Sequence, residues 1–265
     1  MTNAVLRVEQ LCSGYEKQTV FKNLSTSIQE GKITTIIGPN GCGKSTLLKT
    51  VGRILKQKSG KVFLQEQNMQ AISTKEIAKQ LALLSQNPEA PPQLKVEELI
   101  SYGRFPHRKR AGTLSKRDLE VIEWAMKITK TSEFRSREIN QLSGGQRQKV
   151  WLAMALAQET DILLLDEPTT YLDMSHQLEV LKIVDKLNKK HHCTVVMVLH
   201  DINHAARFSD ELIAMKDGEI ITVGTPKEIL TQEVMKQVFQ IDAKIMIDEE
   251  NGSPVCYGYE TLMEE

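Results

Sequence analysis

The feature that most constrains this chain of 265 residues is a glycine-rich segment at positions 38–46. The preceding Ile33–Ile37 is β-branched throughout and predicts a buried strand, and residues 47–55 predict a helix. The segment fits the pattern G-x-x-x-x-G-K-[ST], in which glycines and a helix N-terminus let backbone N–H groups surround phosphate oxygens. We therefore predict a phosphate-binding loop that consists of Gly38, Pro39, Asn40, Gly41, Cys42, Gly43, Lys44, Ser45 and Thr46.

A second predicted strand, at residues 162–165, ends in two carboxylates, Asp166 and Glu167. Strand ends of a parallel sheet gather at one edge, so we expect Asp166 beside the phosphate loop, holding Mg²⁺ together with the Ser45 hydroxyl. The next carboxylate, Glu167, can orient or deprotonate the attacking water. We expect Lys44 to supply positive charge to the β- and γ-phosphates and to stabilise the charge that develops during phosphoryl transfer.

A third segment, Leu-Ser-Gly-Gly-Gln at positions 142–146, predicts a tight turn that opens a helix. Its serine is a favoured N-cap residue, and its two glycines allow another body to approach closely. The turn is a second candidate phosphate site, and two anion sites in one chain indicate a shared nucleotide. The residues of this second site are Ser143, Gly144, Gly145 and Gln146.

Together these segments resemble those of the ATP-binding subunits of ABC transporters, with a match over residues 4–230. In that family two subunits pair head to tail, and each ATP lies between the phosphate loop of one and the Leu-Ser-Gly-Gly-Gln turn of the other. The resemblance implies an active ATPase that uses ATP and Mg²⁺, and the single set of segments favours a homodimer. It also implies adenine stacking by Tyr15, Mg²⁺ coordination and a permease-facing position for Gln86, inter-subunit contact by Asp173 and γ-phosphate contact by His200.

The order of predicted elements indicates an α/β fold with an N-terminal antiparallel β subdomain and an inserted helical lobe. The resemblance implies that its core is a P-loop NTPase core of the ABC type. We expect short antiparallel strands in the first thirty residues and one extra strand in the C-terminal extension. The whole chain, 1–265, is then a single ABC ATP-binding domain. Its parts are a core at 1–87 and 141–240, a helical lobe at 88–140 and a C-terminal extension at 241–265.

Composition indicates a globular protein that reaches a membrane only through a partner. Its apolar runs are far shorter than the ~20 residues of a spanning helix, and its start lacks the features of a signal peptide. Lys plus Arg and Asp plus Glu both number 34, so no basic surplus points to nucleic acid as a partner. With the resemblance, we expect a peripheral protein on the cytoplasmic face of the cell membrane. Its expected partners are transmembrane permease subunits and, indirectly, an extracytoplasmic substrate-binding protein.

Local segments narrow the resemblance to importers of ferric siderophores, haem and vitamin B12. These segments are Tyr102–His107, residues 166–173 and residues 200–207. The first cargo hypothesis is a ferric hydroxamate such as ferrichrome. Another cargo (haem, vitamin B12, zinc or an amino acid) stays open, because no residue of such a subunit contacts the cargo. Two further alternatives are an ABC ATPase that acts on ribosomes or DNA, and a P-loop kinase, for which the Leu-Ser-Gly-Gly-Gln turn has no use.

The sequence leaves two further features with more than one interpretation. Residues 104–117 carry six Lys or Arg and no acid, so they form either a surface for a permease helix or anionic headgroups, or a solvated basic loop. The four cysteines are scattered and include no Cys-x-x-Cys pair, which favours packed, reduced thiols over a zinc site or a disulfide framework.

Overall fold

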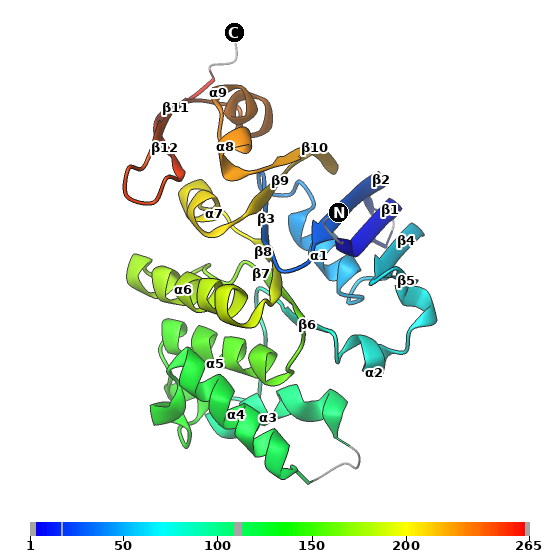
Figure 1. Cartoon of the computed structure of the whole chain (residues 1–265), viewed down its shortest axis with the longest axis vertical. Helices are drawn as coiled ribbons and strands as arrows, with labels where there is room; N and C mark the ends of the chain where they lie inside the picture. The colour runs from blue at the N-terminus through cyan, green and yellow to red at the C-terminus, as the bar shows by residue number, and fades with distance from the viewer. Residues whose placement is uncertain (1–3, 17, 109–112, 263–265) are drawn as a thin grey trace. The chain divides into compact units, whose positions relative to one another are not determined.

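The computed structural model divides into two compact units, which Figure 1 labels element by element. The first unit comprises Met1–Gln70 and Thr194–Glu265, and the second comprises Ala71–Cys193. The structure describes residues 4–16, 18–108 and 113–262. Within these described ranges, no helix combines the length and the apolar character needed to cross a membrane.

The N-terminal part of the first unit is an antiparallel sheet with the strand order β2-β1-β4-β5 (Figure 1). Its strands are β1 (Ala4–Tyr15), β2 (Gln18–Gln29), β4 (Ser59–Leu64) and β5 (Gln67–Asn68). The predicted antiparallel pairing is confirmed, but β1 and β2 are strands of 12 residues each rather than short ones. Register shifts along their pairing break the alternation of apolar and polar residues, so the sequence pattern alone predicts several short strands in place of two long ones.

The rest of the first unit is built around four strands in the order β10-β9-β3-β8. β3 (Ile33–Ile37) lies parallel to both β8 (Thr194–Val198) and β9 (Glu211–Lys216). Every residue of β3 and β8 is buried, which explains their β-branched runs without alternation. β9 returns as β10 (Glu219–Gly224) through the Asp-Gly turn that the sequence predicts.

The helices of the first unit follow local sequence signals. α1 (Lys44–Val51) begins within the phosphate loop and ends before the predicted residue 55, because Gly52 is unfavourable inside a helix. α7 (Ile202–Phe208) begins directly after its N-cap, Asp201, and α8 (Pro226–Ile229) begins with a capping box and a first-turn proline. α9 (Gln232–Val234) and a π-helical turn follow.

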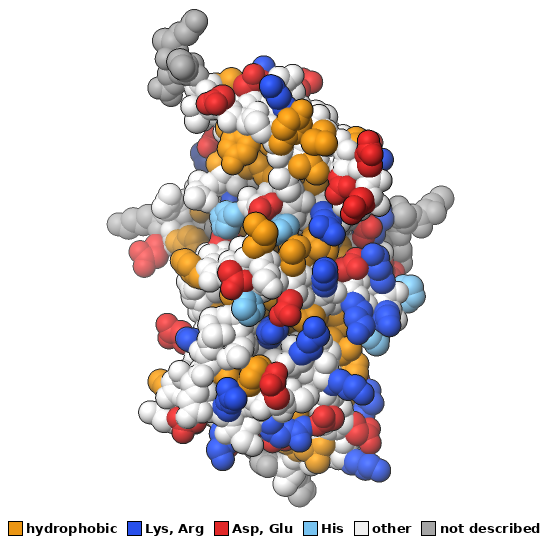
Figure 2. Space-filling view, turned by 90° about the vertical axis from the view of Figure 1, so that its left-hand side faces the viewer, with side chains coloured by type: hydrophobic (Ala, Val, Ile, Leu, Met, Phe, Trp, Pro, Cys, Tyr) orange, Lys and Arg blue, Asp and Glu red, His pale blue; other side chains and the backbone are white. Residues whose placement is uncertain are grey.

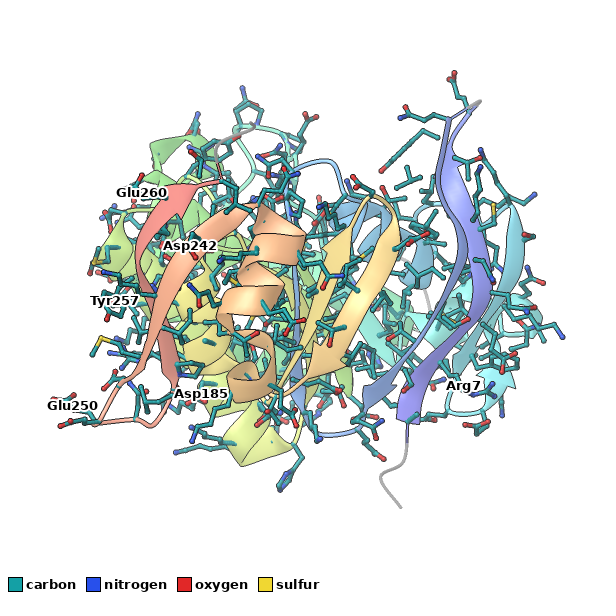
Figure 3. The ribbon with its side chains drawn as sticks, turned by 90° about the horizontal axis from the view of Figure 1, so that it is seen from above. Arg7, Asp185, Asp242, Glu250, Tyr257 and Glu260 are labelled. Atoms are coloured by element: carbon teal, nitrogen blue, oxygen red, sulfur yellow. The ribbon has the colours of Figure 1, made fainter. Side chains whose placement is uncertain are left out.

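The C-terminal extension is a two-stranded antiparallel hairpin, β11 (Ile241–Ile247) and β12 (Pro254–Thr261), rather than the single strand predicted. Figure 3 shows it from above, with Glu250 at its turn. Apolar side chains gather at the upper end of the face in Figure 2, where this hairpin lies, and Tyr257 and Tyr259 of β12 are exposed. The hairpin packs through β12 against α7.

The second unit contains two parallel strands, β6 (Leu81–Leu84) and β7 (Ile162–Asp166), and the strand predicted at residues 162–165 is confirmed as β7. Between them in sequence lies α5 (Gly144–Ala157), which packs against β6, and after β7 comes α6 (Met174–His191). A short helix, α2 (Thr74–Ile77), precedes β6.

Among the described residues of 88–140, every regular element is helical, in agreement with the predicted character of this segment. The elements are α3 (Val96–Ser101), α4 (Lys116–Thr129) and 3₁₀ turns at Tyr102–His107, Ser132–Phe134 and Ile139–Gln141. α4 packs against α5 (Figure 1). The bounds of a separate lobe at 88–140 stay a prediction.

Arg104 corrects the interpretation of the basic stretch 104–117 as a partner surface or a solvated loop. Its side chain is only 3% exposed, and its Nε donates to the Asp118 carboxylate at 2.8 Å. Its Nη1 donates to the Ala157 carbonyl at 2.9 Å and to the Glu159 carboxylate at 3.0 Å. Arg104 is therefore a structural residue that ties the start of α4 to the end of α5. The rest of the stretch includes Lys109 and Arg110, which lie outside the described residues.

Candidate functional site

The phosphate loop has the backbone of an anion-binding loop. Gly43, the N-cap of α1, has a φ of 108°, a conformation that side chains with a Cβ rarely adopt. A Cβ there would also lie 2.9 Å from Val20 of β2, and a Cβ on Gly38 would overlap the Met215 carbonyl of β9. The two glycines therefore let the loop lie directly against strands of the first unit.

The N-terminus of α1 carries no side-chain cap, because glycine occupies the cap position. Lys44 is buried, and its Nζ donates to the carbonyl oxygens of Gly38 and Pro39 at 2.8 Å each. The ammonium group thus folds back over the loop, next to the helix end whose N–H groups are partly positive. This is the arrangement that a phosphate requires, since N–H donors and a cation converge on the same place.

The turn between β9 and β10 supports the loop, a contact that sequence reasoning missed. The Gly218 N–H donates to the Cys42 carbonyl at 3.0 Å. A Cβ on Gly218 would overlap the Val20 carbonyl, so only glycine lets this turn lie so close to β2. The Cys42 side chain itself is buried, and burial raises the pKa of its thiol.

Asp166 ends β7 and Glu167 follows it directly, as predicted, and both are buried. Glu167 accepts hydrogen bonds on one carboxylate oxygen from Gln86 Nε2 and, at 2.9 Å, from the Thr170 hydroxyl. The structure therefore joins two predicted site residues, Gln86 and Glu167, and adds Thr170. The sequence offered no signal for this pairing, because Gln86 lies 81 residues before Glu167.

The Leu-Ser-Gly-Gly-Gln turn opens α5, and Ser143 is its N-cap as predicted. The Ser143 hydroxyl accepts from the Gln146 N–H at 3.3 Å, and the Gln146 side chain accepts from the Ser143 N–H at 3.0 Å. Gly144 is open to solvent, whereas Gly145 is buried and a Cβ on it would overlap the His176 ring. Gly145 therefore has a packing role within the second unit.

Asp173 caps α6 by accepting from the His176 N–H at 2.9 Å, and the His176 ring nitrogen Nδ1 lies 2.9 Å from the same carboxylate. These hydrogen bonds lower the pKa of Asp173. The preceding Tyr171 is 87% exposed and has a φ of 63°. The predicted inter-subunit loop is thus an exposed segment fixed at its end by a helix cap.

A hollow of about 260 Å³ lies beside this loop in the second unit. Its walls include Gln86, Gly144, Arg147, Trp151 and Tyr171. It therefore brings Gln86 and one glycine of the predicted turn to the same concave surface.

The remaining predicted residues lie in the first unit. Tyr15 ends β1 and is 47% exposed, as a stacking residue must be. His200 follows β8, is exposed, and immediately precedes Asp201, the N-cap of α7. Each unit thus carries a part of the predicted site, and whether the parts act on one nucleotide stays a prediction here.

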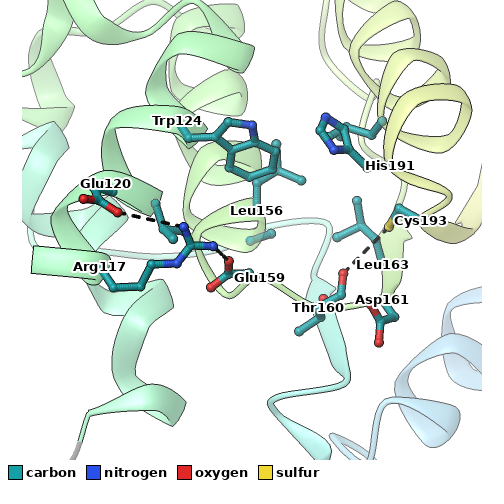
Figure 4. Close-up of a pocket in the computed structure, with 13 residues that line it drawn as sticks. Arg117, Glu120, Trp124, Leu156, Glu159, Thr160, Asp161, Leu163, His191 and Cys193 are labelled. Carbon is teal, nitrogen blue, oxygen red and sulfur yellow. Dashed lines mark hydrogen bonds and ion pairs between the residues drawn. The ribbon is translucent and has the colours of Figure 1, made fainter. Parts of the chain in front are cut away.

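The second unit has another cavity, of about 400 Å³, between α4, the end of α5 and the end of α6 (Figure 4). Trp124 and His191 meet there edge to face, with ring centroids 5.6 Å apart. Cys193 lies in its wall, and burial raises the pKa of that thiol to about 12. Among the described residues that line this cavity there is no predicted site residue, so we assign it no part in nucleotide chemistry.

The side chains predicted to hold Mg²⁺ offer a hydroxyl, a carboxamide and one carboxylate, all oxygen donors. The described residues include no cluster of three or more His, Cys, Asp or Glu that could hold a metal by itself. The oxygen donors of the predicted ligands fit Mg²⁺, which binds through one or two carboxylates together with substrate phosphates and waters. The buried Asp166 suits that role.

Comparison with known proteins agrees with this geometry. The family model described as ABC transporter matches residues 21–170, more than half of the chain. The chain therefore belongs to the ABC transporter family, as one of its ATP-hydrolysing subunits, and the prediction of family and fold is confirmed.

Two relatives indicate a branch of the family. The chain is 53% identical over 260 residues to the Iron(3+)-hydroxamate import ATP-binding protein FhuC of Bacillus subtilis (strain 168), covering 98% of this chain and 97% of that protein. It is 44% identical to the ferric enterobactin transport ATP-binding protein FepC of Escherichia coli (strain K12), covering 96% and 95%.

Solved structures share the fold. A putative metal-chelate type ABC transporter in an inward-facing conformation matches with a TM-score of 0.81 and 27% identity, over 96% of this chain and 97% of that one. The dimeric ABC transporter cassette MJ0796 matches with a TM-score of 0.74 and 30% identity, over 83% and 98%.

Proposed function

We propose that this chain binds and hydrolyses ATP to power the import of ferric hydroxamate siderophore complexes through a membrane permease. The observation that carries the proposal is the 53% identity to an Iron(3+)-hydroxamate import ATP-binding protein. Relatives named for petrobactin, enterobactin and achromobactin are less similar, at 43%, 44% and 42% identity.

The phosphate loop binds the β- and γ-phosphates of ATP. Its backbone N–H groups and the uncapped N-terminus of α1 donate to phosphate oxygens. Lys44 exchanges its two carbonyl partners in the loop for phosphate oxygens, which adds charge-assisted hydrogen bonds. The exposed Tyr15 ring stacks on the adenine.

Mg²⁺ would be held by the Ser45 hydroxyl, the Gln86 carbonyl oxygen and Asp166, and would neutralise phosphate charge in the transition state. Gln86 donates through its nitrogen to Glu167, which leaves its carbonyl oxygen as the atom that would bind the metal. His200 contacts the γ-phosphate and, with Lys44, stabilises the charge that develops there.

Glu167 orients and deprotonates the attacking water. Hydrogen bonds from Gln86 and Thr170 to one of its oxygens fix the direction of the carboxylate. A base that is held in place contributes on the order of 10²–10⁴ to the rate of a proton transfer. Glu167 is also buried, which limits competing water around it.

Two copies of the chain pair head to tail, so that the Leu-Ser-Gly-Gly-Gln turn of one closes over the ATP held by the phosphate loop of the other. Ser143 and Gly145 approach the γ-phosphate, and Gly144 and Gln146 complete the turn. Asp173 and the exposed Tyr171 lie in the loop that meets the second copy. Hydrolysis removes the charge that holds the pair closed.

The dimer binds transmembrane permease subunits on the cytoplasmic face of the membrane, as a peripheral protein. The helical lobe at 88–140 and Gln86 face the permease and transmit opening and closing, and residues 241–265 are an extension of the core. An extracytoplasmic substrate-binding protein delivers the cargo to the permease.

Uptake of radioactive iron by cells that lack this chain tests the proposal. Cells that regain the parent chain should take up iron from ferrichrome, whereas cells that receive Glu167→Gln should not, although that variant still binds ATP. Uptake restored only from ferric enterobactin or haem would contradict the hydroxamate assignment. Tagged Glu167→Gln protein should also retain a multi-spanning permease in detergent, and recovery of ribosomes or DNA instead would contradict the transport role.

A further inference from the structure

Asn203, in the first turn of α7, binds the C-terminal hairpin through both ends of its carboxamide. Its Nδ2 donates to the Cys256 carbonyl of β12 at 3.1 Å, and its Oδ1 accepts from the Cys256 N–H at 2.8 Å. The carboxamide therefore occupies the place of a neighbouring peptide group and pairs with β12 on its outer side. Cys256 is buried and Asn203 is half-buried, so both hydrogen bonds are partly shielded from water.

The same turn of α7 is also stabilised by a hydrogen bond between its own residues. Asp201, the N-cap, accepts from the His204 N–H at 2.7 Å. Asp201 thus fixes the turn locally, whereas Asn203 fixes it to a strand 53 residues further along the chain. All of these residues belong to the first unit.

His200 lies directly before this turn. On its N-terminal side the chain is fixed by β8, a fully buried strand paired with β3. On its C-terminal side the chain is fixed by the first turn of α7. The orientation of the His200 backbone therefore depends on both anchors, and Asn203 is the side chain that connects the second anchor to the hairpin.

We propose that Asn203 is a positioning residue for His200: its pair of hydrogen bonds to Cys256 locks the first turn of α7 to the β11–β12 hairpin and so holds the His200 backbone in place. This inference rests on the proposed function, in which His200 contacts the γ-phosphate. It gives the C-terminal hairpin a part in catalysis, although the hairpin carries no predicted catalytic residue.

The test compares Asn203→Ala with Gln232→Ala in the full chain. Gln232 donates to Asp242 at 2.7 Å, so its loss removes a tie to the same hairpin that does not involve α7. Asn203→Ala should lower kcat about tenfold and leave the KM for ATP within about twofold, because the two lost hydrogen bonds hold the turn that follows His200 and neither is made to ATP. Gln232→Ala should match the parent chain. An equal fall of kcat in both variants would overturn the proposal.

Hydrogen exchange provides a readout that does not depend on catalysis. The backbone amides of residues 200–204 should exchange about tenfold faster in Asn203→Ala than in the parent chain. Asn203→Asp keeps the acceptor for the Cys256 N–H and loses the donor, so it should lie between the two. Faster exchange with an unchanged kcat, or unchanged exchange with any kcat, would overturn the proposal.

A double variant separates positioning from general destabilisation. If Asn203 acts through His200, then Asn203→Ala should lower kcat no further once His200 is already alanine. Additive losses would overturn the proposal. Parental turnover in His200→Ala alone would instead refute the assigned role of His200, and the exchange at residues 200–204 would still decide whether Asn203 fixes the turn.

Discussion

The two helix N-termini predicted to meet ATP differ in how their N–H groups are satisfied. At α1 the cap is Gly43, which offers no side chain, and Lys44 adds a cation above the same N–H groups. At α5 the cap is Ser143, and together with Gln146 it forms a reciprocal capping box. One turn is open to an anion, and the other is already hydrogen-bonded within itself.

This difference predicts a division of labour between the two turns. The α1 turn is preorganised and should bind ATP in a single chain. At the α5 turn the capping box already occupies the N–H groups of Ser143 and Gln146, which fits a surface that acts only when a second copy presents the nucleotide. The variants below test this comparison, from the largest expected effect to the smallest.

Lys44→Ala should weaken ATP binding by a single chain about a hundredfold, because it removes charge-assisted hydrogen bonds at the open turn. Titration calorimetry with ATP measures this directly. Lys49→Ala, in the last turn of the same helix, is the matched control and should bind like the parent chain. Unchanged affinity in Lys44→Ala would contradict the role of the α1 turn.

Gly145→Ala should destabilise the chain by about 1–3 kcal/mol, because the new Cβ would overlap the His176 ring. Thermal unfolding measures the loss, and adding His176→Ala should restore most of it. The double variant separates packing from nucleotide contact. If Gly145 also approaches the phosphate across the dimer, turnover should stay low after stability returns, and full recovery of turnover would show that the glycine serves packing alone.

Asp118 is the third residue of α4 and forms a capping box with Ser115, as Gln146 does with Ser143 in α5. Unlike Gln146, Asp118 can be protonated, so its capping box is sensitive to acid. Burial raises the pKa of Asp118, but hydrogen bonds from Ser115 and Arg104 outweigh burial and set the pKa to about 2, below the ordinary 3.8. A lowered folded-state pKa contributes stability above pH 3.8 that is lost as the pH falls toward 2, here about 2 kcal/mol. Acid unfolding of Asp118→Asn should lack this part of the pH dependence. An identical acid dependence in both chains would contradict the assignment.

Ser143→Ala should cost about 1 kcal/mol of stability, the usual value of an N-cap serine. Ser115→Ala is the matched control, since Ser115 caps α4 with the same capping box. Both variants should unfold at a Tm lower by about 2–4 °C. Only Ser143→Ala should also lower turnover, and both should bind ATP like the parent chain. Equal turnover in the two would argue that Ser143 acts only as a cap.

Elements defined by neighbouring residues were predictable from the sequence. The phosphate loop, the cap at Ser143 and the Asp-Gly turn between β9 and β10 each depend on a few adjacent positions. The start of α7 depends on adjacent positions in the same way, because its N-cap is Asp201.

Partners separated by many residues were not predictable. Arg104 was grouped with a basic stretch, but its ion pair with Glu159 spans 55 residues. Gln86 was expected near the nucleotide, but its bond to Glu167 has no local signal, and neither has the bond of Asn203 to Cys256. Periodicity shows that a side chain is buried, whereas only the fold shows which group it meets.

The central claim is that the open turn of one copy and the capped turn of another hold the same ATP. Sedimentation of the Glu167→Gln chain with saturating ATP and Mg²⁺ tests it most directly, because we expect this variant to bind ATP without hydrolysing it. The account predicts a species of twice 29.9 kDa that returns to the single-chain mass when ATP is removed. A chain that binds ATP and stays at 29.9 kDa would contradict the claim.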